Sequence, residues 1–235
     1  MHLLEQTGID PSAIKKLQIM FMSMGEPMYN WVELREALWQ LWHLYPNARL
    51  LISTSAPRKF DAFEDLMETS KTIPTVGLQF SVHESTDVAR KKLIPSPTMT
   101  LEEIRDTGLA WNKATGRKPF FNYCVHAENN TLDDVNRLRT LFDPSVWEAT
   151  LSVICERNEH IAASNERQRE LASNFAGNMM QVGFNVRVFN PAGADDVGGG
   201  CGQLWFVQEW MRNNPDKAKK SLGFGKPVVH TPMPL

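Results

Sequence analysis

Polar side chains follow five short apolar segments of the chain, and these are the positions whose residue types could do chemistry. They are Gly25-Glu26-Pro27, Ser53-Thr54-Ser55, Ser81-Val82-His83-Glu84, His126-Ala127-Glu128 and Glu156-Arg157-Asn158. Carboxylate, hydroxyl, amide and imidazole groups can hold the charged ends of a small ligand through charge-assisted hydrogen bonds. A packed core does not need a polar group after every segment, so their recurrence indicates a shared binding site.

Each of these residues also has a purely structural explanation. Serine and threonine at such positions commonly form turns or cap helices. Pro27 ends an extended segment, Glu26 suits a loop, and His83 suits a satisfied buried histidine. The recurrence across five segments therefore carries more weight than any single residue.

A glycine-rich stretch near the carboxyl end places a single thiol where it could react. Three glycines, Gly198 to Gly200, precede Cys201, which begins a helical pattern. The amino terminus of a helix lowers the pKa of a cysteine and favours the thiolate, so Cys201 is a candidate nucleophile. A flexible loop with an incidental thiol is the alternative, whereas a phosphate-binding P-loop lacks its lysine here. Cys124 and Cys155 fall inside apolar segments, which predicts buried and slowly reacting thiols.

Short apolar segments alternate with longer amphipathic ones, as in βα units that build a parallel sheet. Strands are expected at residues 17–24, 49–55, 76–82, 120–125, 150–155 and 184–189. Helices are expected at residues 31–44, 60–72, 101–115, 132–142, 165–182 and 203–213. Five or six units are too few for an eight-stranded barrel of about 250 residues, which favours an α/β partial barrel or an open sheet. Ligands of such folds collect at the carboxyl ends of the strands, where the polar residues lie.

Composition indicates an ordinary globular protein. The 235 residues are 42% hydrophobic, with 25 basic and 27 acidic residues and a formal net charge of −2. This balance gives no global signature of nucleic-acid binding. No apolar run is long enough for a membrane span and no secretory signal is present, so we expect a cytoplasmic protein. Residues 214–235 lack periodicity, which predicts an extended tail after a domain at 1–213.

The residues resemble the RlmN/Cfr family of radical S-adenosylmethionine (SAM) enzymes, which methylate an adenosine of large-subunit ribosomal RNA. Six motifs agree in order. They are Met22-Ser23-Met24-Gly25-Glu26-Pro27 with Ser53-Thr54-Ser55, Ser81-Val82-His83, Arg90-Lys91-Lys92-Leu93-Ile94-Pro95, Ser164-Asn165-Glu166, Gly183 to Val188, and Asp195-Asp196 with Cys201-Gly202-Gln203-Leu204.

The resemblance implies roles for eight residues. Gly25 and Glu26 would meet the methionine end of SAM, with Glu26 pairing with its amino group, and Ser53, Ser81, Val82, His83 and Asn158 would line the same site. Cys201 matches the cysteine that is first methylated on sulfur. A 5′-deoxyadenosyl radical from a second SAM would then activate that methyl group for addition to C2 of the adenine. A basic residue usual before the Asp pair is replaced by Ala194.

The chain also departs from the family pattern. The family holds a [4Fe-4S] cluster on a CxxxCxxC motif ahead of the GEP segment, and this sequence contains no such motif. We therefore expect a radical SAM partial barrel truncated on its amino-terminal side, whose ligands for the cluster belong to the complete enzyme and which is inactive alone. A natural short relative that binds SAM or RNA without radical chemistry is the alternative, and a CxxxCxxC encoded upstream of Met1 would distinguish the two. Methylation of C8 instead of C2 stays open.

The resemblance further implies partners. The substrate would be ribosomal RNA or transfer RNA, the reductant a protein such as flavodoxin, and the enzyme a monomer without membrane attachment.

Overall fold

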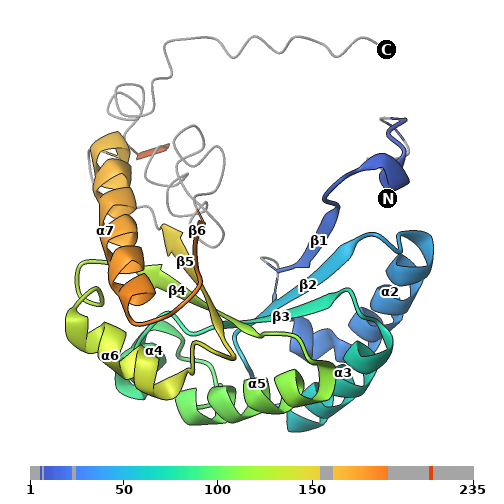
Figure 1. The fold of residues 1–235 in the computed structure, drawn as a ribbon, viewed down its shortest axis with the longest axis horizontal. Coiled ribbons are helices and arrows are strands. Elements are labelled where there is room, and N and C mark those ends of the chain that lie inside the picture. The colour runs from blue at the N-terminus through green and yellow to red at the C-terminus, as the bar shows by residue number, and fades with distance from the viewer. Residues whose placement is uncertain (1–5, 7, 23–24, 154–160, 190–211, 214–235) are drawn as a thin grey trace.

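A computed structural model describes residues 6, 8–22, 25–153, 161–189 and 212–213 of the chain. Six parallel strands form one sheet in the sequential order β1 to β6. Their bounds are β1 (Gln18–Phe21), β2 (Arg49–Thr54), β3 (Val76–Ser81), β4 (Phe120–Val125), β5 (Glu148–Val153) and β6 (Val186–Phe189). The sheet curls into a half-barrel with an open inner side (Figure 1).

Helices cover the outer side of the half-barrel (Figure 1). They are α2 (Trp31–Leu44), α3 (Phe60–Thr72), α4 (Asp87–Leu93), α5 (Leu101–Thr115), α6 (Leu132–Leu141) and α7 (Ile161–Gln181), with 3-10 turns η1 (Pro11–Ala13) and η2 (Pro27–Asn30). Among the helices of the described chain, none has the length and apolar character needed to span a bilayer.

Local sequence explains where several helices begin and end. Thr100 and Thr131 each cap a helix in a reciprocal capping box, with Glu103 and Asp134 as the third helical residues. These side chains satisfy backbone N–H groups that the first turn leaves free. Gly116 ends α5 in the left-handed region at φ 70°, which glycine adopts without strain.

The hydrophobic core lies between the sheet and the helices. Alternate strand residues point into it, so that Leu50, Ile52 and Thr54 of β2 are buried while Leu51 and Ser53 are half-buried. At the centre of the core, Trp147 packs beside Phe80 and Phe142. A β-carbon on Gly108 of α5 would collide with the indole of Trp147, so only glycine fits there.

The strand register fixes which residues share the inner face. Ser81 of β3 lies beside Asn122 of β4, which lies beside Thr150 of β5, which lies beside Arg187 of β6. The seams between strands differ in length: three residue pairs join β3 to β4, whereas six join β4 to β5. One row of the inner face is therefore polar across four consecutive strands.

The expected α/β partial barrel with parallel strands is confirmed. Helices α2, α3 and α5 and strand β4 have the expected bounds. The first strand was expected at 17–24 but ends at Phe21, because the chain turns into the Gly25-Glu26 loop. Helix α4 was not expected; Thr86 caps its seven residues, which are too few for a clear amphipathic period. The helix expected at 203–213 lies almost wholly outside the described residues, and the tail at 214–235 lies wholly outside them.

Candidate functional site

The carboxylate of Glu26 joins the loop after β1 to the end of β2. One oxygen accepts from the N–H of Met28 at 3.0 Å and from the hydroxyl of Thr54 at 2.5 Å. The other accepts from the N–H and the hydroxyl of Ser55, both at 2.7 Å. Gly25, at φ 93°, makes the turn that delivers Glu26 to this position.

Four donors use the ordinary acceptor capacity of one carboxylate. Glu26 is thus a cross-strand clamp as well as a candidate SAM ligand. An ammonium group at this carboxylate would share oxygens that already serve Thr54 and Ser55. The sequence pattern indicated that Glu26 lies at the strand ends but did not reveal this clamp.

The end of β3 holds the next three candidate residues. Ser81 is half-buried on the inner face, whereas the side chain of Val82 is fully buried in the core, so only the backbone of Val82 is available to a ligand. His83 adopts φ 64°, and its N–H and that of Val82 both donate to the carbonyl of Asn122. Left-handed backbone is uncommon outside glycine and is often found at functional turns.

The imidazole of His83 is half-buried, and its Nδ1 is a buried atom without a hydrogen-bond partner in the described structure. Desolvation, together with the nearby positive charge of Arg90, lowers the pKa of His83 to about 4. The ring is therefore neutral near pH 7, and its buried Nδ1 makes no hydrogen bond to the described residues. The alternative of a fully satisfied core histidine is not what the structure shows.

Arg90 of α4 forms hydrogen bonds to the ends of both β2 and β3. Its side chain is buried and donates to the carbonyls of Ser55 at 2.7 Å and Ser81 at 3.1 Å. It also donates to Thr98 and to the carbonyl of Met99. Burial lowers the pKa of this guanidinium. The first residue of the Arg90-Lys91-Lys92-Leu93-Ile94-Pro95 motif thus positions two strand ends that carry candidate residues.

The ends of β3 and β4 are tied together by Asn129 and by an acid–histidine pair. The amide of Asn129 donates to the carbonyls of His83 and Cys124. Nε2 of His126 lies 2.8 Å from the buried carboxylate of Glu84. Because Nδ1 of His126 accepts from the N–H of Glu128, the proton of a neutral ring belongs on Nε2, where it can be donated to Glu84.

Two polar contacts on the inner face involve Gln79, Asn122 and Ser152, which were not singled out from the sequence. Gln79 donates to the hydroxyl of Ser53 at 3.1 Å, and Ser152 donates to the amide oxygen of Asn122 at 2.8 Å. Both pairs alternate with buried apolar residues along their strands. That alternation was the available signal, since it separates inner-face residues from core residues.

The remaining candidates divide between described and undescribed residues. Cys124 lies in β4 as expected but is half-buried on the inner face instead of fully buried. Desolvation and the nearby Glu84 carboxylate raise its pKa to about 12, which keeps it a thiol. Asn158, Cys155, Cys201 and the Asp195-Asp196 pair lie outside the described residues.

The residues present suit SAM better than a cluster. The half-buried hydroxyls of Ser53 and Ser81 on the inner face are groups that a polar ligand would use. Within the described ranges, no group of three or more His, Cys, Asp or Glu side chains could hold a metal ion. We therefore assign no residue of this site to an iron–sulfur cluster.

Known proteins resemble this chain over most of its length. The chain is 27% identical over 211 residues to a dual-specificity RNA methyltransferase RlmN of Roseobacter denitrificans, across 83% of the chain and 49% of that protein. It is 29% identical over 199 residues to a ribosomal RNA large subunit methyltransferase Cfr of Bacillus velezensis, across 80% of the chain and 55% of that protein. No family model matches the chain.

The chain is a homologue of the RlmN and Cfr methyltransferases. It spans about half the length of these relatives. The fold agrees with a solved radical SAM methyltransferase from Sphaerobacter thermophilus at a TM-score of 0.62 and 20% identity, which covers 86% of this chain and 57% of the other. The expected relationship to RlmN and Cfr is thus confirmed, and the half-barrel is the architecture of that neighbour.

Proposed function

We propose that this chain binds SAM at the carboxyl ends of β1 to β3 and takes part in methylation of RNA. The observation that carries the proposal is the gathering of Glu26, Ser53, Ser81 and His83 at three adjacent strand ends, with Nδ1 of His83 lacking a partner in the described structure. RNA is proposed as the substrate because the relatives are named RNA methyltransferases.

Each residue has a role that its chemistry supports. Glu26 would hold the methionine ammonium group while it keeps the loop closed against β2. The hydroxyls of Ser53 and Ser81 and the neutral ring of His83 would orient the rest of the molecule. SAM, when bound, supplies the methyl group. Asn158 remains a proposed ligand on the strength of the sequence resemblance.

We place the methyl carrier at Cys201, also from the sequence. Its thiolate would attack the methyl carbon of SAM, forming a new carbon–sulfur bond while the bond to the sulfonium sulfur breaks and S-adenosylhomocysteine leaves. Onward transfer to C2 of an adenine in 23S rRNA or tRNA would need a [4Fe-4S] cluster and a reductant such as flavodoxin, as the resemblance implies. Methylation of C8 remains the second candidate for the same site.

Calorimetric titration of the chain with SAM tests the binding site. We expect weak binding, in the high micromolar range or weaker, because this sequence has no CxxxCxxC motif to hold a cluster whose iron would chelate the amino and carboxylate groups of SAM. Ser81→Ala should weaken it further, whereas Ser145→Ala, an exposed serine in the turn before β5, should not. Binding in the nanomolar range would mean that the site is organised differently.

Peptide mapping tests the carrier. After incubation of the complete enzyme with labelled SAM, the label should be found on Cys201. A label on Cys124 or Cys155 but never on Cys201 would contradict this assignment. An enzyme that binds SAM and RNA but never transfers the label would favour the alternative of a binding protein without radical chemistry.

A further inference from the structure

The inner face of β6 carries an exposed arginine and an aromatic ring that no role described above uses. Arg187 pairs in register with Thr150, and Phe189 pairs with Ser152, which places both residues on the inner side of the half-barrel. The guanidinium of Arg187 lies 5.7 Å from the centre of the Phe189 ring. Arg187 is exposed and Phe189 is half-buried, so both are accessible from the hollow.

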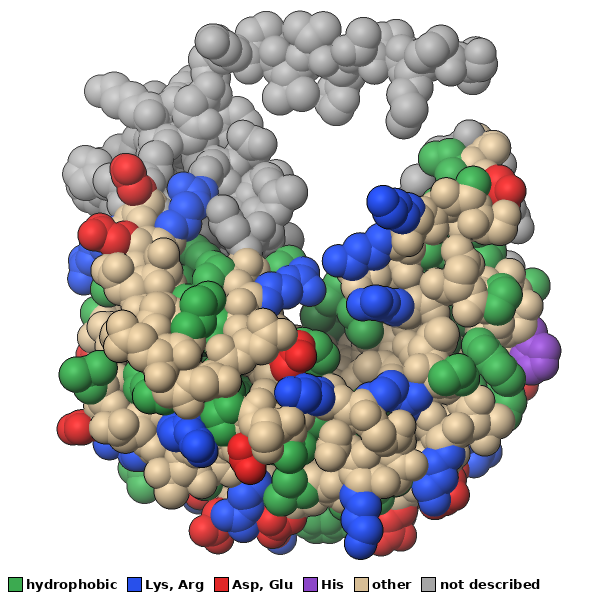
Figure 2. Space-filling view, in the orientation of Figure 1, with side chains coloured by type: hydrophobic (Ala, Val, Ile, Leu, Met, Phe, Trp, Pro, Cys, Tyr) green, Lys and Arg blue, Asp and Glu red, His purple; other side chains and the backbone are tan. Residues whose placement is uncertain are grey.

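The charge of Arg187 differs in setting from that of four other arginines of the chain. Arg35, Arg58, Arg105 and Arg137 each pair with a carboxylate. Within the described part of the chain, Arg187 and the exposed Arg49 at the start of β2 form no ion pair. The space-filling view shows the hollow of the half-barrel with Lys and Arg side chains on both of its borders (Figure 2).

Neighbouring groups on the same wall suit a nucleotide. The hydroxyl of Ser152 donates to the amide oxygen of Asn122, while the amide nitrogen of Asn122 is a donor without an acceptor among the described residues. The guanidinium of Arg187 and the ring of Phe189 lie on β6, and the amide of Asn122 lies on β4. These are the groups with which proteins bind phosphate, stack a base and bond a base edge.

We propose that a single-stranded segment of RNA crosses the inner wall, with Arg187 and Arg49 binding phosphates and Phe189 stacking on a base. This inference rests on the proposed function and extends it from the SAM site to the path of the substrate. Arg187 and Arg49 thereby place two positive charges that form no ion pair with described residues where the RNA would lie. Glu148, half-buried at the start of β5, is a carboxylate on the same wall and opposes this binding by repulsion.

Fluorescence anisotropy of a labelled single-stranded RNA, titrated with the whole chain at low and moderate salt, tests the proposal. Arg187→Ala and Arg49→Ala should each weaken binding. For each phosphate that is no longer bound, the slope of log K against log salt concentration should become shallower by about 0.7. Phe189→Leu should weaken binding about fivefold or more while leaving the salt dependence unchanged. Glu148→Gln should strengthen binding.

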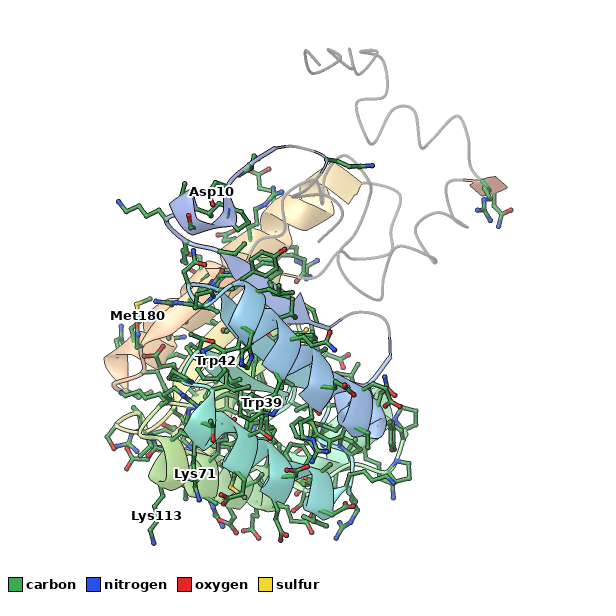
Figure 3. All side chains as sticks on the ribbon, turned by 90° about the vertical axis from the view of Figure 1, so that its right-hand side faces the viewer. Asp10, Trp39, Trp42, Lys71, Lys113 and Met180 are labelled. Atoms are coloured by element: carbon green, nitrogen blue, oxygen red, sulfur yellow. The ribbon has the colours of Figure 1, made fainter. Side chains whose placement is uncertain are left out.

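Lys113 provides the matched control. It is exposed at the end of α5, has no ion pair among the described residues, and lies in the outer layer (Figure 3). Lys113→Ala removes the same charge as Arg187→Ala but should change affinity less than twofold. Circular dichroism and thermal melting of every variant establish that the fold is retained.

The outcomes separate this inference from the proposed function. Equal losses with Lys113→Ala and Arg187→Ala would overturn the path, because the attraction would then be general. RNA binding that survives Arg187→Ala, Arg49→Ala and Phe189→Leu unchanged would overturn the path but leave RNA as the substrate. A chain that binds no RNA even at low salt would overturn both.

Discussion

Glu26 and Ser55 are joined by two hydrogen bonds of 2.7 Å, from the backbone N–H and from the hydroxyl of Ser55 to one carboxylate oxygen. We predict that Glu26→Gln destabilises the protein even without SAM. Whichever way the amide is turned, its NH2 group faces the N–H of Met28 or of Ser55, and neither backbone donor can rotate away. One unsatisfied donor costs about 1–3 kcal/mol. Thermal melting should show a drop of roughly 2–4 °C per kcal/mol.

Glu64→Gln in the exposed part of α3 is the control for that substitution, and its melting temperature should not move. An unchanged melting temperature for Glu26→Gln would mean that the carboxylate serves a ligand and not the fold.

The depressed pKa of His83 predicts a loss of stability in acid. The folded protein binds the proton only near pH 4, whereas the unfolded chain binds it near 6.5. The stability that depends on a neutral ring is therefore full above pH 6.5 and is lost as the pH falls toward 4, by at most about 3 kcal/mol. Urea unfolding between pH 4 and pH 7 measures this dependence.

His83→Asn should flatten that pH dependence, because asparagine does not titrate and tolerates φ 64°. His83→Val should also remove the titration but should destabilise at every pH, since a β-branched residue is strained there. An unchanged pH profile for His83→Asn would show that another group titrates in this window.

Arg90→Lys should be strongly destabilising although it conserves charge. One ammonium cannot replace the fork that reaches Ser55, Ser81 and Met99 together, so buried carbonyls lose their donors. We expect a loss of about 2–4 kcal/mol in urea unfolding, from one or two unsatisfied acceptors. Arg105→Lys at a partly exposed site of α5 should be nearly neutral. Equal effects of the two substitutions would show that the hydrogen bonds of Arg90 do not hold the strand ends together.

Cys124 and Cys201 should differ in the rate at which iodoacetamide alkylates them. With a pKa near 12, Cys124 contains little thiolate at pH 8 and should react with iodoacetamide far more slowly than Cys201, whose sequence favours a lowered pKa. Quenched time points analysed by mass spectrometry give the order of labelling. Cys124 reacting first would contradict both assignments.

Much of the fold could be predicted from periodicity. Helices α2, α3 and α5 have long amphipathic patterns, and α5 also has Thr100 and Gly116 at its ends, so both pattern and caps agree. Strand β4 was placed correctly because its apolar run is too short for a buried helix, and in the structure its residues alternate between half-buried and buried. Helix α4 has too short a pattern to be recognised, and its main contribution is the long reach of Arg90 across two strands.

The candidate site was predictable in position but less so in detail. Strand ends in a parallel sheet converge, so Glu26, Ser53 and Ser81 could be grouped in advance. Which donors occupy the Glu26 carboxylate depends on Thr54 and Ser55 being brought beside it by the β1–β2 pairing. The left-handed backbone of His83 depends on the fit of β3 against Asn122, and no local sequence signal requires it at a histidine.

The short seam between β3 and β4 has a mechanical consequence. Only three residue pairs connect β3 to β4, whereas six connect β4 to β5. We expect the half-barrel to bend most easily along the line between β3 and β4, at whose carboxyl end the N–H groups of Val82 and His83 and the amide of Asn129 add hydrogen bonds between the two strands. Flexing about this line changes the distance between the arm that carries Arg49 and the arm that carries Arg187. The width of the hollow therefore depends on the stiffness of this seam and of the hydrogen bonds at its end.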